Sequence, residues 1–175
     1  NSAAFHSLVD GNGPTLVIFK ASNGQVFGGY NSNSWSSSSG YNYSSESFLF
    51  NLNSNLKGDV NNPQYSTANH SSYGPTFGSG HYIYINSTMD GGYFYPGGYN
   101  FLGGTSPYSV NALQLLTGVQ SNGYYSFGSG FITEIEVYGF DFDLSAPIVK
   151  GQDITVTLDA SGNASITAQD IDTGS

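Results

Sequence analysis

Short apolar runs, separated by turns rich in glycine, serine and asparagine, recur along the chain. Runs of this kind predict β-strands at Thr15–Lys20, Gln25–Tyr30 and Ser47–Leu52. Asn23-Gly24, between the first two runs, is the dipeptide that most favours a tight β-hairpin. Ser47–Leu52 is apolar at most positions, which predicts a strand buried on both faces.

His81–Asn86 alternates in a different way, with aromatic and aliphatic side chains at successive positions. In a strand, alternate side chains point to opposite faces of the sheet. The pattern therefore predicts that Ile83 and Ile85 share one face, with His81, and that Tyr82 and Tyr84 share the other.

Phe131–Phe140 is the longest predicted strand, and alternation places Ile132 on the same face as Glu134 and Glu136. Two carboxylates two residues apart on a strand lie about 7 Å from each other. That spacing fits an inverting glycosidase, which needs about 6.5–9.5 Å between its two carboxylates. Alternating glutamates are also what a solvated sheet face looks like. We favour this second interpretation and expect no enzymatic activity.

Two short helices complete the predicted fold. Residues 2–9 form the first, with Ser2 as its N-cap, and Val110–Leu116 form the second, ended by Gly118. Many short strands and few helices predict a mainly-β chain, a two-sheet β-sandwich with a few short helices.

The composition changes after Phe142, where a linker with Pro147 follows. Ile154–Leu158 and Ala164–Ala168 then predict a C-terminal β-hairpin. Two strands alone are marginally stable in water, so this hairpin is expected to belong to a truncated second module. The predicted boundaries are 1–142 for the sandwich, 143–147 for the linker and 148–175 for the fragment.

The charge balance excludes several classes of partner. Among 175 residues, Lys and Arg number 3 and Asp and Glu 12, giving a net charge of -9. Nucleic acids and anionic membrane surfaces attract clustered cations, so neither is an expected partner. The chain has no cysteine, which excludes disulfides, thiol catalysis and cysteine-ligated zinc. Few charges and many small polar and tyrosine residues favour a secreted or cell-surface protein.

Metal binding has little support in the sequence. The run beginning at Asp10 resembles a calcium loop, but Pro14 stands where a ligand is needed. The three histidines lack the spacing of a zinc site. We expect no cofactor, although Asp141 and Asp143 leave a structural calcium ion possible.

The surplus of aromatic residues is the most informative feature, at 15% of the chain. Residues 31–45 and 90–104 read as long loops that carry many rings. Exposed rings stack on the apolar faces of sugars, while loop amides and hydroxyls bind the sugar hydroxyls. The alternative is that the rings fold back and fill the ends of the sandwich. The candidate ligand-binding residues are Trp35, Tyr41, Tyr43, Tyr93, Tyr95, Tyr99 and Tyr124.

Several motifs together resemble the TLDc domain over residues 1 to about 142. The segments that carry the resemblance are Phe5-His6, Asp10–Thr15, Val26–Tyr30, Ser34–Ser36, Ser47–Phe50, Asn62–Tyr65, Ser72–Gly78, His81–Ile85 and Ile135–Val137. The resemblance implies a β-sandwich with a few short helices. Eukaryotic members of that family are linked to oxidative-stress protection and to the vacuolar proton pump. The chain departs from the family pattern at Tyr82, where many relatives have Asp.

The tail resembles the opening of a HYR repeat, an immunoglobulin-like module of secreted and adhesive proteins. Ala146–Val149, Asp153–Leu158 and Gly162–Thr167 carry this similarity. The pairing of the two families implies a secreted bacterial multimodular protein.

These observations lead to one functional hypothesis and two alternatives. The hypothesis is a non-catalytic carbohydrate-binding module, monomeric and tethered to further modules. Its ligand would be a neutral or lightly charged polysaccharide, with an agar-type algal galactan, and hence a marine bacterium, as the first choice. The first alternative is a protein-interaction or adhesion module of a bacterial surface protein. The second is a TLDc-type interaction domain related to oxidative stress.

Overall fold

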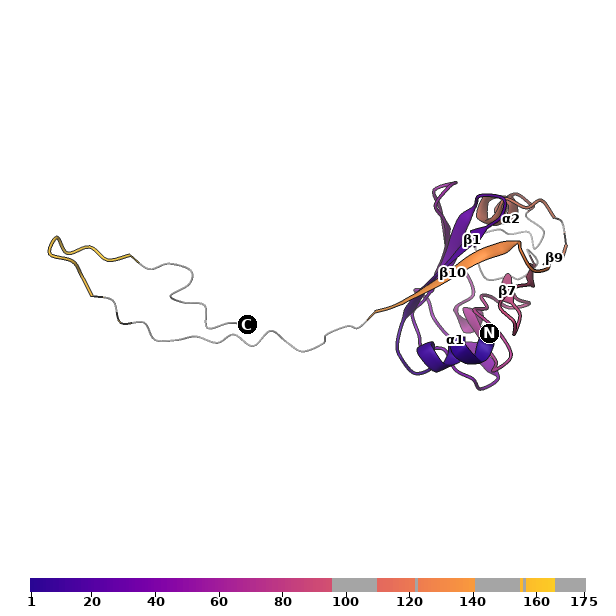
Figure 1. Cartoon of the computed structure of the whole chain (residues 1–175), viewed down its shortest axis with the longest axis horizontal. Coiled ribbons are helices and arrows are strands. Elements are labelled where there is room, and N and C mark those ends of the chain that lie inside the picture. Colours follow the sequence, from indigo (N-terminus) through magenta and orange to yellow (C-terminus); the bar gives the residue numbers. More distant parts are fainter. Residues whose placement is uncertain (96–109, 122, 141–154, 156, 166–175) are drawn as a thin grey trace. The chain divides into compact units, whose positions relative to one another are not determined.

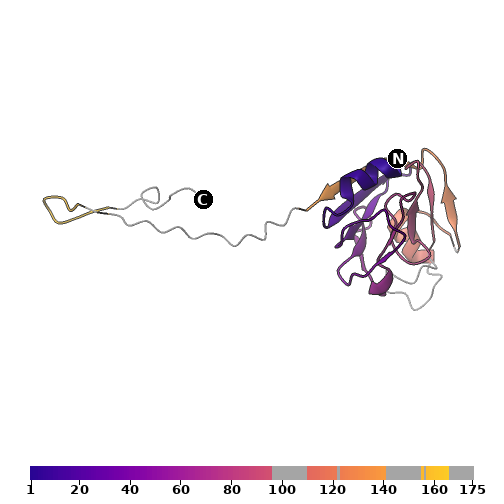
Figure 2. The same cartoon turned by 90° about the horizontal axis from the view of Figure 1, so that it is seen from below.

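The structure is a computed structural model, and it describes residues 1–95, 110–121, 123–140, 155 and 157–165. The chain divides into two compact units, Asn1–Asp141 and Phe142–Ser175. The elements of the first unit are shown in Figures 1 and 2. No helix in the described part of the chain is long and apolar enough to cross a membrane.

The first unit begins with helix α1, Ser2–Val9. Its N-cap is Asn1, whose side-chain oxygen accepts a hydrogen bond from the Ala4 amide at 3.0 Å. The prediction that Ser2 caps the helix is therefore wrong by one residue. The helix ends at Asp10, where the backbone becomes extended. Helix α2, Val110–Thr117, ends at Gly118 as predicted, because a φ of 73° favours glycine.

Five antiparallel strands form the larger sheet, in the order β10-β1-β2-β4-β5. The strands are β1 (Thr15–Ala21), β2 (Val26–Asn31), β4 (Phe48–Asn51), β5 (Leu56–Asp59) and β10 (Ile132–Gly139). The hairpin at Asn23-Gly24 joins β1 to β2, with φ 82° at Gly24. Leu49 and Phe50 are both buried, so β4 is covered on both faces, as predicted.

The second layer consists of a two-stranded and a three-stranded sheet. Phe77 joins them, because it bridges both Thr67 and Ile83. The strands are β3 (Gly40–Asn42), β6 (Thr67–Asn69), β7 (Ile83–Ile85), β8 (Gly92–Phe94) and β9 (Tyr125–Phe127), with the short helix η1 (Pro63–Tyr65) between β5 and β6. Strands β3 and β8 lie inside segments expected to be loops. Both are only three residues long, which gives a periodic pattern little room to show.

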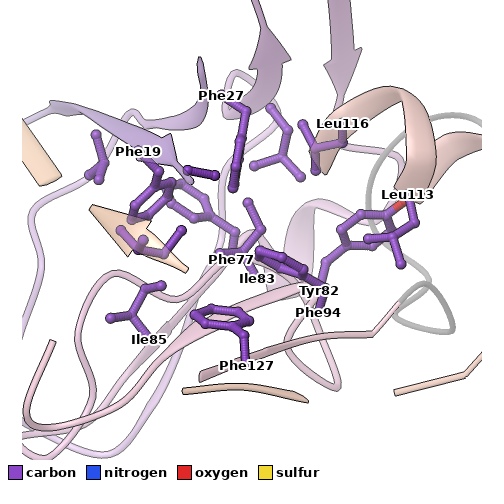
Figure 3. Close-up of a cluster of buried hydrophobic side chains, with 14 of the residues drawn as sticks. Phe19, Phe27, Phe77, Tyr82, Ile83, Ile85, Phe94, Leu113, Leu116 and Phe127 are labelled. Carbon is purple, nitrogen blue, oxygen red and sulfur yellow. The ribbon is translucent and has the colours of Figure 1, made fainter. Parts of the chain in front are cut away.

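The two layers share one hydrophobic core (Figure 3). Phe19 and Phe27 of the larger sheet pack there with Ile83 and Phe94 of the second layer, and the Phe27 and Phe94 rings lie 5.7 Å apart. The fold is therefore mainly β and sandwich-like, as the alternating patterns indicate.

A bulge in β10 corrects one predicted face. The pairing with β1 shifts between Lys20 and Ala21, so that Glu134 pairs with Lys20 and Ile132 with Ala21. Thr133 is the extra residue, and its hydroxyl donates to the Lys20 carbonyl at 3.0 Å. One extra residue reverses the alternation. Ile132 is consequently buried in the core instead of lying beside the glutamates.

Of the second unit, the structure describes little beyond a tight turn. The Asp159 amide donates to the Asn163 carbonyl at 2.8 Å, and the Asp159 carboxylate accepts from the Ser161 and Asn163 amides. This turn lies where the sequence predicts one. Half of the residues in the two predicted strands lie outside the described residues, as do the 143–147 linker, Asp141 and Asp143.

Candidate binding surface

Trp35, the only tryptophan, lies in the core and not on a ligand-binding surface. Its side chain is 1% exposed. The indole N–H donates to the Thr15 hydroxyl at 2.7 Å, and the ring makes edge contacts with Phe5 and Phe77. No ring face is left for a sugar, so the expectation that Trp35 is an exposed stacking ring is wrong. Its neighbours come from α1 and from residue 77, which the sequence does not place beside it.

Among the described residues, the outer face of the sheet β7-β8-β9 carries a dense group of partly exposed rings. Ile83, Ile85 and Phe94 point into the core, so Tyr84 and Tyr93 point the other way, and these two residues pair across the strands. We call the group of rings formed by these two residues and their neighbours the aromatic array. Its members are His70, Tyr73, His81, Tyr84, Tyr93, Tyr95 and Tyr124.

Ring stacking makes the array continuous from β7 to the residue before β9. The centroids of Tyr84 and Tyr93 are 4.7 Å apart, with 29° between the ring planes. Tyr93 contacts the edge of Tyr124 at 5.3 Å, and Tyr124 stacks on Tyr95 at 4.1 Å and 7°. Tyr124 is the most exposed of these, at 62%. Rings held in this way form a preorganised apolar surface.

The array extends on its other side through residues that sequence reasoning missed. Tyr73 contacts Tyr84 edge to face at 5.0 Å and His81 at 5.2 Å, and it stacks on His70 at 4.7 Å. Alternation along His81–Asn86 places Tyr84 on the face of the strand opposite to Ile83, and this was the available signal. The same pattern wrongly groups Tyr82 with Tyr84. Tyr82 precedes the strand and is buried, next to a left-handed backbone at His81.

Burial changes the pKa of three residues in the centre of the array. It lowers the pKa of His81, whose Nδ1 lies 2.5 Å from the Tyr93 hydroxyl oxygen. Burial, together with the charges of neighbouring tyrosines, raises the pKa of Tyr93 to about 12. Burial likewise raises the pKa of Tyr84. At neutral pH these three residues are therefore uncharged.

The remaining candidates divide into two groups. Tyr41 on β3 and Tyr43 just after it are exposed, and Tyr41 meets the edge of Tyr65 at 5.1 Å. Tyr99 lies outside the described residues. The structure therefore brings together Tyr93, Tyr95 and Tyr124 of the predicted set.

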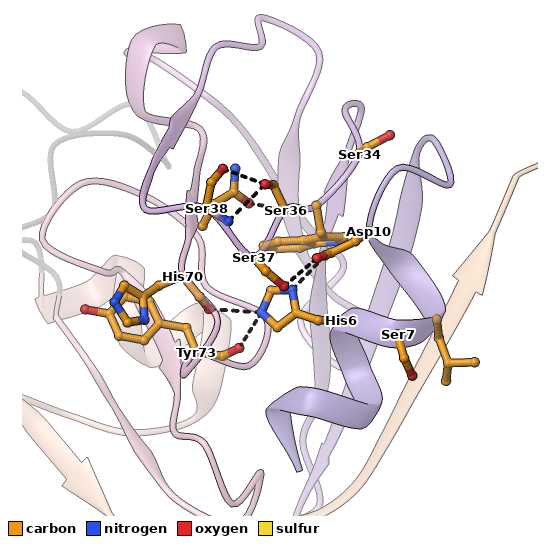
Figure 4. A network of polar contacts seen from close by, with 12 residues as sticks. His6, Ser7, Asp10, Ser34, Ser36, Ser37, Ser38, His70 and Tyr73 are labelled. Carbon is orange, nitrogen blue, oxygen red and sulfur yellow. Dashed lines mark hydrogen bonds and ion pairs between the residues drawn. The ribbon is translucent and has the colours of Figure 1, made fainter.

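A histidine–aspartate pair lies next to the backbone of His70 and Tyr73 in the array (Figure 4). His6 Nδ1 lies 2.6 Å from the Asp10 carboxylate, and Nε2 lies 2.9 and 3.0 Å from the carbonyls of His70 and Tyr73. Asp10 also accepts the Ser37 hydroxyl at 2.6 Å. The pair ties α1 to the segment that carries the first two rings of the array.

This pair predicts a specific response to acid. Burial alone would raise the pKa of Asp10, but hydrogen bonds from Ser37 and His6 and the charge of His6 outweigh it, so the pKa is below 3.8. The stabilisation is then complete above pH 3.8 and is lost as pH falls through the folded pKa. We expect Asp10→Asn to lower the free energy of unfolding at pH 7 by about 1.5–3 kcal/mol. This deficit should be smaller at about pH 3, because it shrinks as the pH falls below 3.8.

Urea titrations at both pH values measure this difference. Asp59→Asn is the matched control, because Asp59 is exposed and its pair with Lys57 on the surface contributes little. An Asp10→Asn deficit that is equally large at both pH values would show that the carboxylate charge is not responsible.

The described residues hold no cluster of three or more His, Asp or Glu side chains able to bind a metal. Glu134 and Glu136 are exposed on β10. Glu134 lies 3.6 Å from Lys20, and Glu136 accepts the Tyr138 hydroxyl at 2.7 Å. Neither carboxylate lines the array.

A sandwich-like β domain with an aromatic sheet face is the class of protein that these features define. The sequence model of the TLDc domain matches residues 1–141, and the chain belongs to the TLDc family. A search of curated proteins found no significant match.

Proposed function

We propose that this TLDc domain is a non-catalytic carbohydrate-binding module that holds a polysaccharide on the aromatic array. The single observation that carries the proposal is the continuous row of ring contacts that joins Tyr84, Tyr93, Tyr124 and Tyr95 on one sheet face. Sugar rings present apolar C–H faces that stack on such surfaces. Several rings in a row suit a polymer better than a single sugar.

The distribution of charge supports a neutral polymer. Lys20 and Lys57, the two lysines among the described residues, lie on β1 and β5 of the larger sheet. The sheets of the second layer carry none. A sulfated or uronate polymer is recognised through Arg or Lys, so it would lack its counter-charge here. An agar-type galactan remains our first choice of ligand.

The setting of the domain is part of the same proposal. Low charge, many small polar residues and the HYR-like tail support a secreted bacterial multimodular protein in which the domain is a tethered monomer. Membership of the TLDc family is compatible with the alternative of an interaction domain related to oxidative stress. An adhesion module would use the same exposed rings on a protein ligand.

Affinity electrophoresis in gels containing agarose or other neutral polysaccharides tests the proposal. Stacking on one preformed ring contributes about 1–2 kcal/mol, by analogy with base stacking. We therefore expect Tyr93→Ala and Tyr124→Ala each to weaken binding about five- to thirty-fold. Tyr138→Ala is the matched control, because Tyr138 is also an exposed tyrosine but lies on β10 of the larger sheet.

The outcomes separate the candidates. If Tyr93→Ala and Tyr124→Ala are both retarded as strongly as the wild-type domain, the array is not the binding surface. Absence of retardation in every neutral polysaccharide would overturn carbohydrate binding and leave the two interaction-domain alternatives.

A further inference from the structure

An apolar groove of about 370 Å³ lies between α1 and β10, and no residue of the array lines it. Figures 1 and 2 show α1 in indigo alongside β10 in orange. The lining of the groove includes Phe5, Leu8, Val9, Ile135 and Val137. Leu8 is 73% exposed, which is unusual for a leucine on a helix that faces a groove.

The backbone of β10 is unpaired on one side. Among the described strands, β10 is at the edge of its sheet, and only β1 pairs with it. The Phe140 amide donates to the Pro14 carbonyl at 3.2 Å, which fixes the alternation of the ladder. Glu134, Glu136 and Tyr138 therefore bond to β1. The N–H and C=O groups of Ile135 and Val137 point away from the sheet.

The side chains at this edge show which sequence could pair with it. Ile135 and Val137 line the groove. Glu134 and Glu136 are exposed and alternate with them along the strand, and atoms of Glu134 also line the groove. An added strand would place alternate side chains beside each set. Apolar residues would enter the groove, and basic residues would lie beside the glutamates.

We propose that the free edge of β10 binds an extended polypeptide in which apolar residues alternate with Lys or Arg, as a sixth strand of the sheet. Main-chain hydrogen bonds supply affinity in this mode of recognition, and alternate side-chain positions supply specificity. A second copy of this chain is disfavoured, because two β10 strands would bring their glutamates together and the whole chain carries a net charge of -9.

Fluorescence anisotropy with a short, capped, labelled peptide of alternating valine and lysine tests this site. We expect binding that weakens about tenfold in Glu136→Lys, where attraction becomes repulsion. The same variant should gain binding to a valine–glutamate peptide. Asp59→Lys is the matched control, because it makes the same charge change on β5, at the opposite edge of the sheet; it should leave binding unchanged.

Three results of the peptide-binding assay would overturn the proposal. The first is binding of neither peptide to the wild-type domain. The second is equal weakening of binding by Glu136→Lys and Asp59→Lys, which would show that the peptide responds only to the net charge of the domain. The third is undiminished binding of a peptide whose valine amides are methylated, because such a peptide cannot bond to a strand edge. Light scattering at the same protein concentrations reports whether a second copy occupies the edge, which would also contradict the proposal.

Discussion

Replacement of Trp35 by alanine will lower the free energy of unfolding by about 3–5 kcal/mol. The side chain is 1% exposed and contacts both Phe5 and Phe77, so its loss leaves a cavity in the centre of the core. Trp35→Phe keeps most of the packing but leaves the Thr15 hydroxyl without its donor, and a loss of about 1–2 kcal/mol is expected.

Urea unfolding followed by circular dichroism measures both changes, because the variants lack the only tryptophan fluorophore. Tyr124→Ala provides the contrast. Its ring is 62% exposed, and its removal should change stability by no more than about 0.5 kcal/mol. A Trp35→Ala domain with wild-type stability and impaired polysaccharide binding would restore the interpretation of Trp35 as a ligand contact.

Gly28→Ala will destabilise the larger sheet by about 3 kcal/mol or more. A Cβ at Gly28 would lie 1.9 Å from the Val17 carbonyl oxygen of the neighbouring strand. Backbone atoms cannot move aside as a flexible side chain can, so β1 and β2 would have to separate. Glycine within a strand commonly marks such a close approach.

Gly139→Ala is the matched control in the same sheet, because an added Cβ there meets no atom within 4 Å. We expect a change of no more than about 0.5 kcal/mol. Thermal and urea unfolding of both variants gives the comparison. Equal stability of Gly28→Ala and Gly139→Ala would show that the contact between the strands relaxes without loss.

Features that depend on neighbouring residues could be predicted from the sequence. The hairpin at Asn23-Gly24 follows from local backbone preferences, and the end of α2 follows from Gly118. Features that depend on distant partners could not. The burial of Ile132 requires a bulge that only pairing with β1 reveals, and the burial of Trp35 requires contacts with residues 5 and 77.

The candidate site shows the same division. Tyr93, Tyr95 and Tyr124 were recognised as aromatic residues in segments without a pattern demanding burial. Their arrangement was not foreseen, because the array is set by the pairing of β7 with β8 and β9. The sequence indicated ligand-binding loops, whereas the largest group of partly exposed rings lies on a sheet face. Tyr73 was missed because only the fold brings it beside Tyr84.

The most direct test of the central claim is a titration of the isotopically labelled domain with soluble neutral galactan oligosaccharides, followed by nuclear magnetic resonance. If the array binds the sugar, amide shifts will change at Ile83–Ile85, Gly92–Phe94 and Tyr124–Phe127 and will stay constant along Ile132–Gly139. Saturable shifts confined to Ile132–Gly139 and α1, or a spectrum unchanged by every oligosaccharide, would contradict the account.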